Sequence, residues 1–351
     1  MNESDLRTLR AMFRHVSELD QDLRPSGFWT GFGRDNEDKL MQYGIENFKR
    51  TVNQNYFNSI PVSPTHNLYM QVEAYWQAHP DPAALQVELD DWEVFHSVFF
   101  DQNPLADPVN RALYARYVGM LWHLVRHGEP NGILDRLAEP ELGNPLRTRL
   151  GGRLISQDLA NSVKEHNTIL HAFDGGTDPS RRLVVGELGA GYGRVAYVFL
   201  ATRAVQYVVI DVPPALFVSQ WYLSRLFPQR RVFAFRPFKS FEEVAGELAS
   251  ADIAFLTPDQ FYLLPDGYFD IFLTISSLAE MTWSQISQYI GLMCSKTKSR
   301  IYIKQWREWS NPIDKMTLTQ SDYDLLPGWH KRIDRVDSVQ NLFFETLWEA
   351  D

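Results

Sequence analysis

The sequence has 351 residues, too many for one small domain and comfortable for two. With 44% hydrophobic residues it can bury a large core, and a net charge of −10 with interspersed signs argues against a nucleic-acid groove, which needs a basic stripe. The one cysteine, Cys294, excludes an internal disulfide framework and is expected to be a small buried residue.

The first residues lack the basic and apolar segments of a signal peptide. No apolar run reaches the length of a membrane span. We therefore expect a cytoplasmic protein without a membrane span.

Residues 1–140 are predicted to form a helical N-terminal domain. Apolar residues recur at helical spacing over the first 25 residues and predict one amphipathic helix there. Further helices are predicted over residues 67–78, 90–100 and 107–127. We expect this domain to bind the acceptor or to mediate assembly, and a homodimer is the assembly we consider.

The stretch 25–64 is rich in aromatic and turn-forming residues. Its aromatic residues include Phe28, Trp29, Phe32, Tyr43, Phe48, Tyr56 and Phe57. We expect most of them to form the core of the helical domain and a few to line an acceptor pocket, because aromatic faces stack well on sugar rings.

Residues 139–155 contain several glycines and prolines and are interpreted as a connector between two domains. Ser156 is then predicted to cap a helix that has Asp158 in its first turn. The apolar face of this helix contains Leu159, Val163, His166, Leu170 and Phe173. A histidine on such a face is more often a satisfied core residue than a base, so His166 is the weaker candidate for catalysis. Residues 174–182 are predicted to form a loop.

Residues 183–211 carry the strongest functional pattern in the chain. Residues 183–188 are typical of a buried parallel strand, and Gly189, Gly191 and Gly193 follow at alternate positions. A predicted helix and a second apolar strand come next, and that strand ends in Asp211, about 20 residues after the glycine turn. A carboxylate in that place binds ribose hydroxyls in nucleotide-binding units, so we predict a cofactor that contains a nucleoside.

The identity of the cofactor follows from charge. The dinucleotide fingerprint G-x-G-x-x-G requires a glycine where this sequence has Arg194. Glu187, just before the first glycine, repels a pyrophosphate but suits a ligand that is positively charged at that end. S-adenosylmethionine has a sulfonium, an ammonium group and a ribose, and no phosphate. We therefore predict an S-adenosylmethionine site that includes Glu187, the three glycines and Asp211; a turn that only packs a strand on a helix leaves both acids unexplained.

Strand and helix alternate over residues 183–303, which predicts an α/β fold with a parallel, doubly wound, Rossmann-like sheet. Ligands of such sheets bind at the carboxyl ends of the strands. The polar segments that follow predicted strands are Gly189–Gly193, Asp211 with Val212, Thr257–Gln260, and Ser276–Glu280. We expect them to converge on one edge. Val212, Thr257, Asp259, Gln260 and Ser276 are predicted to contact the cofactor, with Thr257 to Gln260 flanking its adenine.

Several segments resemble the sugar O-methyltransferase family of natural-product and surface-polysaccharide gene clusters, which belongs to the class I methyltransferases. The matching segments are Gly143-Asn144-Pro145, Ile155-Ser156-Gln157-Asp158-Leu159, Glu187 with the three glycines, Ile210-Asp211-Val212-Pro213-Pro214, Tyr222-Leu223, Leu256-Thr257-Pro258, Ser277 with Glu280-Met281, and Lys304-Gln305-Trp306. The resemblance covers residues 140–345 approximately. It implies a Rossmann-like methyltransferase domain over residues 141–351, S-adenosyl-L-methionine as cofactor, and a sugar-containing small molecule or glycan as acceptor.

Methyl transfer to a hydroxyl requires a base that takes the hydroxyl proton. Glu280 follows a predicted strand on the expected edge and is the best-placed spare carboxylate, although a helix-capping role fits it equally well. His166, Lys304 and His330 are weaker candidates. The sequence has no H-x-x-x-H pattern, cysteine pair or dense carboxylate cluster, so no metal ligand is predicted, and Mg²⁺ held by scattered acids stays open.

Two other functions fit part of the pattern. An NAD-dependent oxidoreductase uses the same type of sheet, although Arg194 stands where its fingerprint needs a glycine. A non-catalytic protein could keep the cofactor fold as a binding module. Comparing S-adenosylmethionine with NAD as ligands, and then measuring methyl turnover, separates the three.

Overall fold

A computed structural model gives the fold of most of the chain. It describes residues 1–20, 23–51, 60–80, 86–95, 102–129, 131–171, 181–311, 313, 315–325 and 327–351. Some predictions fall outside these residues: those for Tyr56, Phe57 and Phe173, for the last part of the predicted helix 90–100, and for most of the predicted loop 174–182. The chain forms two compact units, a first unit of residues 1–37, 176–337 and 342–351 and a second unit of residues 38–175 and 338–341.

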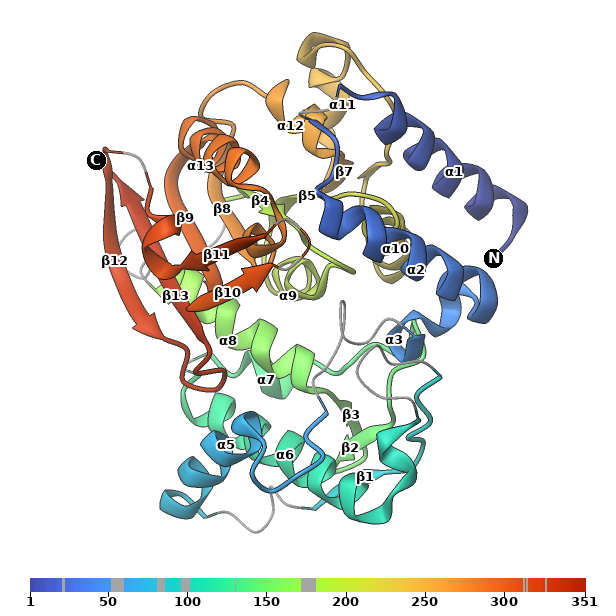
Figure 1. Ribbon diagram of the computed structural model, residues 1–351, viewed down its shortest axis with the longest axis vertical. Coiled ribbons are helices and arrows are strands. Elements are labelled where there is room, and N and C mark those ends of the chain that lie inside the picture. The colour runs from blue at the N-terminus through green and yellow to red at the C-terminus, as the bar shows by residue number, and fades with distance from the viewer. Residues whose placement is uncertain are drawn as a thin grey trace. The chain divides into compact units, whose positions relative to one another are not determined.

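The first unit is built on an eight-stranded sheet in the order β12-β13-β9-β8-β4-β5-β7-β6 (Figure 1). Its strands are β4 (Leu183–Leu188), β5 (Val205–Ile210), β6 (Val232–Phe233), β7 (Ile253–Leu256), β8 (Phe269–Ile275), β9 (Thr297–Trp306), β12 (Trp329–Val336) and β13 (Phe343–Ala350). The strands from β9 to β6 are mutually parallel, and β13 runs antiparallel to both β9 and β12. The predicted α/β, doubly wound, Rossmann-like class is confirmed.

Helices cover both faces of this sheet. They are α9 (Arg194–Thr202), α10 (Ala215–Leu226), α11 (Ala245–Ser250), α12 (Pro258–Tyr262) and α13 (Trp283–Lys296). On one face, α11, α12 and α13 contribute Leu248, Phe261 and Ile290 to one apolar cluster with strand residues such as Ile303. On the other face, Phe199 of α9 packs on Tyr207 of β5 with ring centroids 5.7 Å apart.

The sheet is extended first on one side of β4 and later on its other side, and this order determines where a ligand can bind. The chain passes from β4 to β5 and β7 on one side, and then returns to place β8 and β9 on the other side. The strand order therefore reverses between β4 and β8. In open α/β sheets the ligand crevice lies at the carboxyl ends of the strands at such a switch point.

The sequence analysis missed two features of the first unit. An antiparallel hairpin, β10 (Glu308–Asn311) with β11 (Met316–Thr319), lies between β9 and β12 in the chain. The other is β12 itself, whose residues alternate little in exposure because most of them face solvent. A strand with so few buried positions has no clear period-2 pattern of apolar residues.

The N-terminal helices differ from the prediction. Helix α1 (Glu3–Glu18) begins at Asn2, whose side chain accepts the Asp5 N–H, and it ends well before residue 25. Helix α2 (Gly27–Tyr43) occupies much of the stretch interpreted as turn-rich, because its glycines and aromatic residues obscure the helical period. The structure groups residues 1–37 with the sheet, whereas the sequence analysis placed them in a domain of residues 1–140. The functions assigned to the two predicted domains stay predictions.

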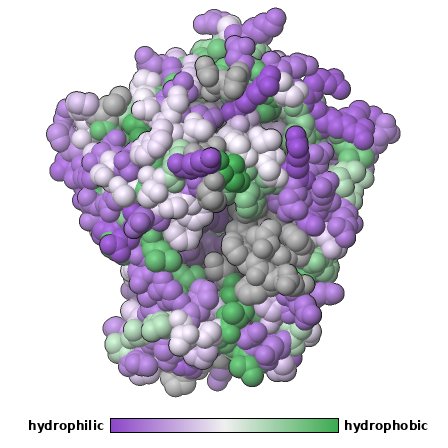
Figure 2. Space-filling view, in the orientation of Figure 1, coloured by the Kyte–Doolittle hydropathy of each residue, from purple (hydrophilic) through white to green (hydrophobic). Residues whose placement is uncertain are grey.

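Within the described part of the chain, no helix is both long and apolar enough to cross a membrane. On the face drawn in Figure 2, hydrophilic residues predominate and hydrophobic residues occur in separate patches.

The second unit contains helices and one small sheet. Its elements are η2 (Ile45–Asn47), α3 (Phe48–Thr51), α5 (Asn67–Ala78), η4 (Pro104–Ala106), α6 (Pro108–His127), α7 (Ile133–Arg136), α8 (Gln157–His171) and the antiparallel strands β1 (Val87–Leu89), β2 (Thr148–Leu150) and β3 (Arg153–Ile155). The helices predicted over 67–78 and 107–127 are confirmed as α5 and α6. The predicted connector 139–155 instead contains β2 and β3, which are too short to show a strand pattern.

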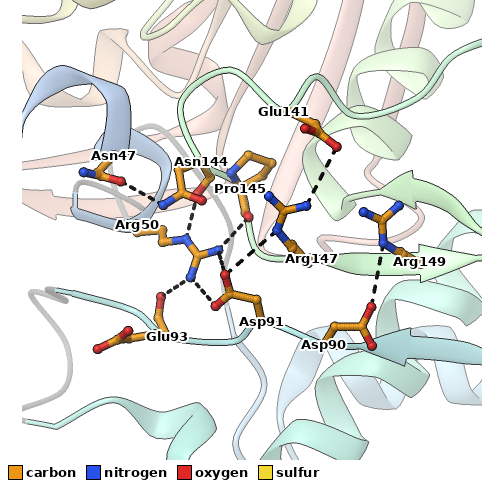
Figure 3. Close-up of polar contacts among 10 residues, drawn as sticks. All are labelled: Asn47, Arg50, Asp90, Asp91, Glu93, Glu141, Asn144, Pro145, Arg147 and Arg149. Carbon is orange, nitrogen blue, oxygen red and sulfur yellow. Dashed lines mark hydrogen bonds and ion pairs between the residues drawn. The ribbon is translucent and has the colours of Figure 1, made fainter.

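The helix predicted over 90–100 is wrong for its described residues, since 90–95 are not helical. Buried Arg50 holds this segment extended (Figure 3). Its Nη atoms donate to Asp91 Oδ1 at 2.7 Å and Oδ2 at 2.8 Å, and Nη1 also donates to the Glu93 carbonyl at 3.0 Å. The remaining donors reach the carbonyls of Asn144 at 2.9 Å and Pro145 at 3.1 Å. One guanidinium therefore ties three chain segments together.

Candidate functional site

A pocket in the first unit lies at the carboxyl ends of four adjacent strands. The strand ends contribute Leu188 and Gly189 from β4, Ile210, Asp211 and Val212 from β5, Pro258 after β7, and Ser277 and Met281 after β8. Helix α13 contributes Gln285 and Tyr289, the linker between α1 and α2 contributes Leu23, Arg24, Pro25 and Ser26, and α2 contributes Trp29. The pocket is therefore at the switch point of the sheet, where ligands of such folds bind.

The three glycines of the turn have backbone angles that L-residues rarely adopt. Their φ angles are +75° at Gly189, +58° at Gly191 and +87° at Gly193. A Cβ on Gly189 would lie 2.0 Å from Ser277 Oγ, and a Cβ on Gly193 would lie 2.8 Å from Leu223 Cδ1. The turn after β4 thus packs directly on the segment after β8 and on α10, and only glycine permits this.

Asp211 is the acidic group at the centre of the pocket. Its Oδ2 accepts the N–H of Gly191 at 2.8 Å, and its Oδ1 accepts the N–H of Val212 at 2.7 Å. The residue is 4% exposed. Burial raises the pKa of Asp211 to about 7, although the two backbone hydrogen bonds lower it. The predicted ribose ligand is therefore a carboxylate that the glycine turn itself holds in place.

Glu187 lies beside the turn, on β4, and is not among the described residues that line the pocket. Its side chain is buried, and its Oε2 accepts the hydroxyl of Tyr207 at 2.6 Å. Its predicted contact with the cofactor stays a prediction.

The residues after β7 divide into two roles. Gln260 is fully buried, its Oε1 accepts the Thr257 N–H at 3.0 Å, and its Nε2 donates to the Arg236 carbonyl at 2.8 Å, so it braces its loop. Asp259 instead pairs with His15 of α1, whose Nε2 is 2.9 Å from Asp259 Oδ2. Its second oxygen, Oδ1, is buried and has no hydrogen-bond partner. The adenine contacts predicted for Thr257, Asp259 and Gln260 stay predictions.

Ser276 lies between β8 and the short turn η6 (Leu278–Glu280), and Glu280 is the last residue of that turn. Ser276 has a φ of +55°, and its N–H donates to the Lys304 carbonyl at 2.8 Å. Burial, and to a smaller extent the nearby charge of Asp211, raise the pKa of Glu280 to about 8, although the Trp29 side chain lowers it. Asp211 lines the pocket, and Glu280 lies in the turn after β8 between the pocket residues Ser277 and Met281; raised pKa values such as theirs are frequent in functional sites.

The weaker base candidates have other environments. His166 belongs to α8 of the second unit, is 3% exposed, and has its Nδ1 3.2 Å from Asn167 Oδ1, as expected for a core histidine. Lys304 forms a buried ion pair with Asp337 at 2.9 Å. His330 is exposed and pairs with the terminal residue Asp351. None of the three is among the described residues that line the pocket.

Sequence reasoning missed the contribution of the linker between α1 and α2. The aromatic composition of residues 25–64 was the one available signal, and it did not distinguish Trp29 from its neighbours. Contacts between residues more than 250 positions apart, such as Ser26 with Glu280, leave no local pattern.

Basic side chains are rare around the pocket. Arg24 is the only basic side chain among the described lining residues, and its Nε donates to the Leu19 carbonyl at 2.7 Å. No group of three or more His, Cys, Asp or Glu residues within the described ranges could hold a metal ion.

Comparison with known proteins shows only distant structural similarity. No family model matches the chain, and no curated protein matches it. The structure is similar to 1,6-didemethyltoxoflavin-N1-methyltransferase of Burkholderia thailandensis, solved with bound 1,6-didemethyltoxoflavin and S-adenosylhomocysteine (16% identity, 54% of this chain and 78% of that chain, TM-score 0.37). It is similar to magnesium protoporphyrin IX methyltransferase of Synechocystis PCC 6803, solved with S-adenosylmethionine (11% identity, 66% and 90%, TM-score 0.36). A methyltransferase of Aquifex aeolicus has 13% identity, coverage of 53% and 89%, and a TM-score of 0.32. What this chain binds must therefore follow from its own residues.

Proposed function

We propose that this protein is an S-adenosylmethionine-dependent O-methyltransferase that acts on a hydroxyl of a sugar or of a glycosylated acceptor. The observation that carries the proposal is the placement of Asp211. Its buried carboxylate lines the pocket at the switch point and is held there by the N–H groups of Gly191 and Val212.

This arrangement suits a nucleoside with a positive charge better than a dinucleotide. A pyrophosphate needs free backbone N–H groups in the glycine turn. Here the Gly191 N–H already donates to Asp211, and a pyrophosphate would lie against that carboxylate. A ribose hydroxyl, in contrast, can donate to a carboxylate oxygen that still has a free lone pair.

When bound, S-adenosylmethionine supplies a methyl group on a sulfonium. In the proposal, Asp211 accepts the ribose hydroxyls, and the bare backbone of Gly189 and Gly191 allows the cofactor to approach closely. Glu280 takes the proton of the acceptor hydroxyl. A carboxylate whose pKa lies near 8 is well suited to this, because a general base works best when its pKa is close to the working pH.

The acceptor class rests on the resemblance to the sugar O-methyltransferase family. Two of the most distinctive matching segments, Asp211-Val212-Pro213-Pro214 and Glu280-Met281, each contribute residues to this pocket.

Calorimetric titration tests the proposal. The wild-type protein is expected to bind S-adenosylmethionine and not NAD. Asp211→Ala removes the ribose acceptor and Gly191→Val puts a side chain into a strained backbone position beside the ligand, so both variants should lose most of the affinity. Tight binding of NAD, or unchanged binding of S-adenosylmethionine by both folded variants, would falsify the assignment.

A further inference from the structure

One wall of the pocket is formed by residues 23–29, which we call the strap. It comprises the end of the linker between α1 and α2 and the first residues of α2. The strap residues that line the pocket are Leu23, Arg24, Pro25, Ser26 and Trp29. The other described lining residues belong to the strand ends and to α13, so a ligand in this pocket lies between them and the strap. The pocket has about 410 Å³ of empty space, including the part open to solvent, and sites of this size bury most of the surface of a small ligand.

Two side-chain hydrogen bonds attach the strap to the segment that follows β8. Ser26 Oγ donates to the Glu280 carbonyl at 2.6 Å. Gln285 Nε2, at the start of α13, donates to the Arg24 carbonyl at 2.8 Å. Both bonds join residues that are more than 250 positions apart, and both hold the strap against the strand-end side of the pocket.

The strap itself buries little surface. Ser26 is 5% exposed, but Leu23, Pro25 and Trp29 are only partly buried, and Arg24 is exposed. Segments with few buried apolar contacts open locally at a much lower cost in free energy than the core of the same protein.

The segments on both sides of the strap are held more firmly. The side chains that α1 buries are Leu9, Met12 and Val16. His15 of α1 also pairs with Asp259 after β7, with its Nε2 2.9 Å from Asp259 Oδ2. In α2, Gly33 is buried, and a Cβ on it would lie 3.6 Å from the Pro213 carbonyl oxygen after β5. The strap is therefore a weakly held piece between two anchored helices, and it can move while both helices stay in place.

We propose that the strap is a gate for the pocket: it opens to let the ligand enter and leave, and the hydrogen bonds made by Ser26 and Gln285 hold it closed. The identity of the ligand rests on the proposed function, whereas the opening of the strap is independent of it.

Stopped-flow kinetics with S-adenosylhomocysteine as the probe tests the gate. The two hydrogen bonds lie within the protein, so their loss should raise the open fraction both with and without the probe. Ser26→Ala and Gln285→Glu should therefore each increase the association and dissociation rate constants together, by about three- to tenfold, the factor that corresponds to one neutral hydrogen bond. A strap that only contacts the ligand would change the dissociation rate and leave the association rate as it is in the wild type.

Gln288→Glu is the matched control for Gln285→Glu. Gln285 Oε1 accepts the Thr282 N–H at 3.0 Å in the capping box of α13, and glutamate keeps this acceptor while it loses the donor to Arg24. Gln288 is an exposed residue of the same helix and is not among the described lining residues. Its substitution adds the same charge and should leave both rates unchanged.

Asn2→Ala is the control for Ser26→Ala. Ser26 Oγ also accepts the Trp29 N–H at 3.3 Å at the start of α2, so alanine removes a helix cap together with the bond to Glu280. Asn2 caps α1, where it accepts the Asp5 N–H at 2.9 Å, and it does not line the pocket. Unchanged association rates in Ser26→Ala or in Gln285→Glu, or equal increases in a variant and its control, would overturn the inference. If Ser26→Ala does not fold, Gln285→Glu decides alone.

Hydrogen exchange separates a failure of the gate from a failure of the proposed function. In the wild type, the amides of residues 23–29 should exchange by local opening, faster than those of β4 and β5, and both variants should speed this exchange by the same three- to tenfold factor. If the wild type does not bind S-adenosylhomocysteine but shows this exchange pattern, the proposed function fails and the strap stands. Exchange of residues 23–29 that is as slow as in β4, or equally fast in wild type and both variants, contradicts the gate whatever the protein binds.

Discussion

Asp211 and Glu280 show how far single residues could be predicted. Asp211 was found because its spacing from the glycine turn is set by the geometry of a strand, a turn and a helix, which is local in sequence. Its hydrogen bond to the Gly191 N–H connects the two ends of that unit. Glu280 was found by its position after a strand, but the hydrogen bond that its carbonyl accepts from Ser26 Oγ joins residues 254 positions apart. Nothing in the local pattern specifies such a pair.

Glu280→Gln separates the catalytic role of this residue from a structural one. The substitution keeps the size of the side chain and removes its basicity, so turnover should fall by about 10²- to 10⁴-fold while the affinity for S-adenosylmethionine stays nearly normal. In the wild type the rate should rise with pH through about 8, the pKa of Glu280, and the variant should lack this limb. A variant with normal turnover and a lower melting temperature would make Glu280 a structural brace.

The same variant has a predictable effect on stability. The pKa of Glu280 is raised in the folded protein, so the folded state holds this proton more tightly than the unfolded state does. The free energy of unfolding should therefore decline as pH rises from the ordinary carboxyl pKa through about 8, and Gln at this position removes that part of the decline. Urea denaturation of both proteins at several pH values measures the difference.

At the scale of secondary structure, the prediction succeeded where apolar patterns were long or strongly buried. Strands β4, β5, β7 and β8 are mostly apolar and buried along almost their whole length, as expected for a parallel sheet that is covered on both faces. It failed for α2, where glycines and aromatic residues hide the helical period, and for the segment 90–95, where a tertiary contact with Arg50 overrides local preference. In both cases the missing information is a contact rather than a propensity.

Arg50→Lys tests whether that contact stabilises the second unit. The buried guanidinium makes five hydrogen bonds to two other chain segments, and a lysine has only three donors on one nitrogen. Leaving buried acceptors without a donor should lower the free energy of unfolding by about 1–3 kcal/mol.

Arg149 offers the matched control for this substitution (Figure 3). Its Nε lies 3.7 Å from Asp90 Oδ2, and the Asp90 side chain is 58% exposed. Arg149→Lys should change the free energy of unfolding by less than about 1 kcal/mol, as is usual for surface ion pairs. Denaturant unfolding followed by hydrogen exchange in residues 90–95 reports on this unit specifically, and equal losses in the two variants would contradict the role given to Arg50.

At the scale of the whole molecule, the sheet order explains why separate polar segments could be assigned to one site. The glycine turn, Asp211, Pro258 and Ser277 are far apart in the chain, and each follows a parallel strand of the same sheet. Parallel strands place their carboxyl ends on one edge, so the convergence could be predicted once the strands were identified. The linker between α1 and α2, which also lines the pocket, does not follow a strand of this sheet, and its place in the site could not be predicted in this way.

The pKa values of Asp211 and Glu280 lead to a final prediction, which concerns the binding of the cofactor. Burial raises the pKa of Asp211 to about 7, and burial together with the charge of Asp211 raises that of Glu280 to about 8, so near neutral pH the pair holds at least one proton. A sulfonium and a ribose hydroxyl both favour the ionised carboxylates. Binding of S-adenosylmethionine should therefore release up to about one proton, and the affinity should increase as pH rises from 6 to 9, as linkage requires.

Calorimetry in buffers of different ionisation enthalpy measures this proton release, after correction for the ionisation of the ligand itself. Glu280→Gln should release less, because one of the two titrating groups is gone. S-adenosylhomocysteine, which has the same ribose but no sulfonium, should also release less than S-adenosylmethionine. Proton uptake on binding, or a release that is the same for both ligands and both proteins, would show that the sulfonium does not lie near these carboxylates.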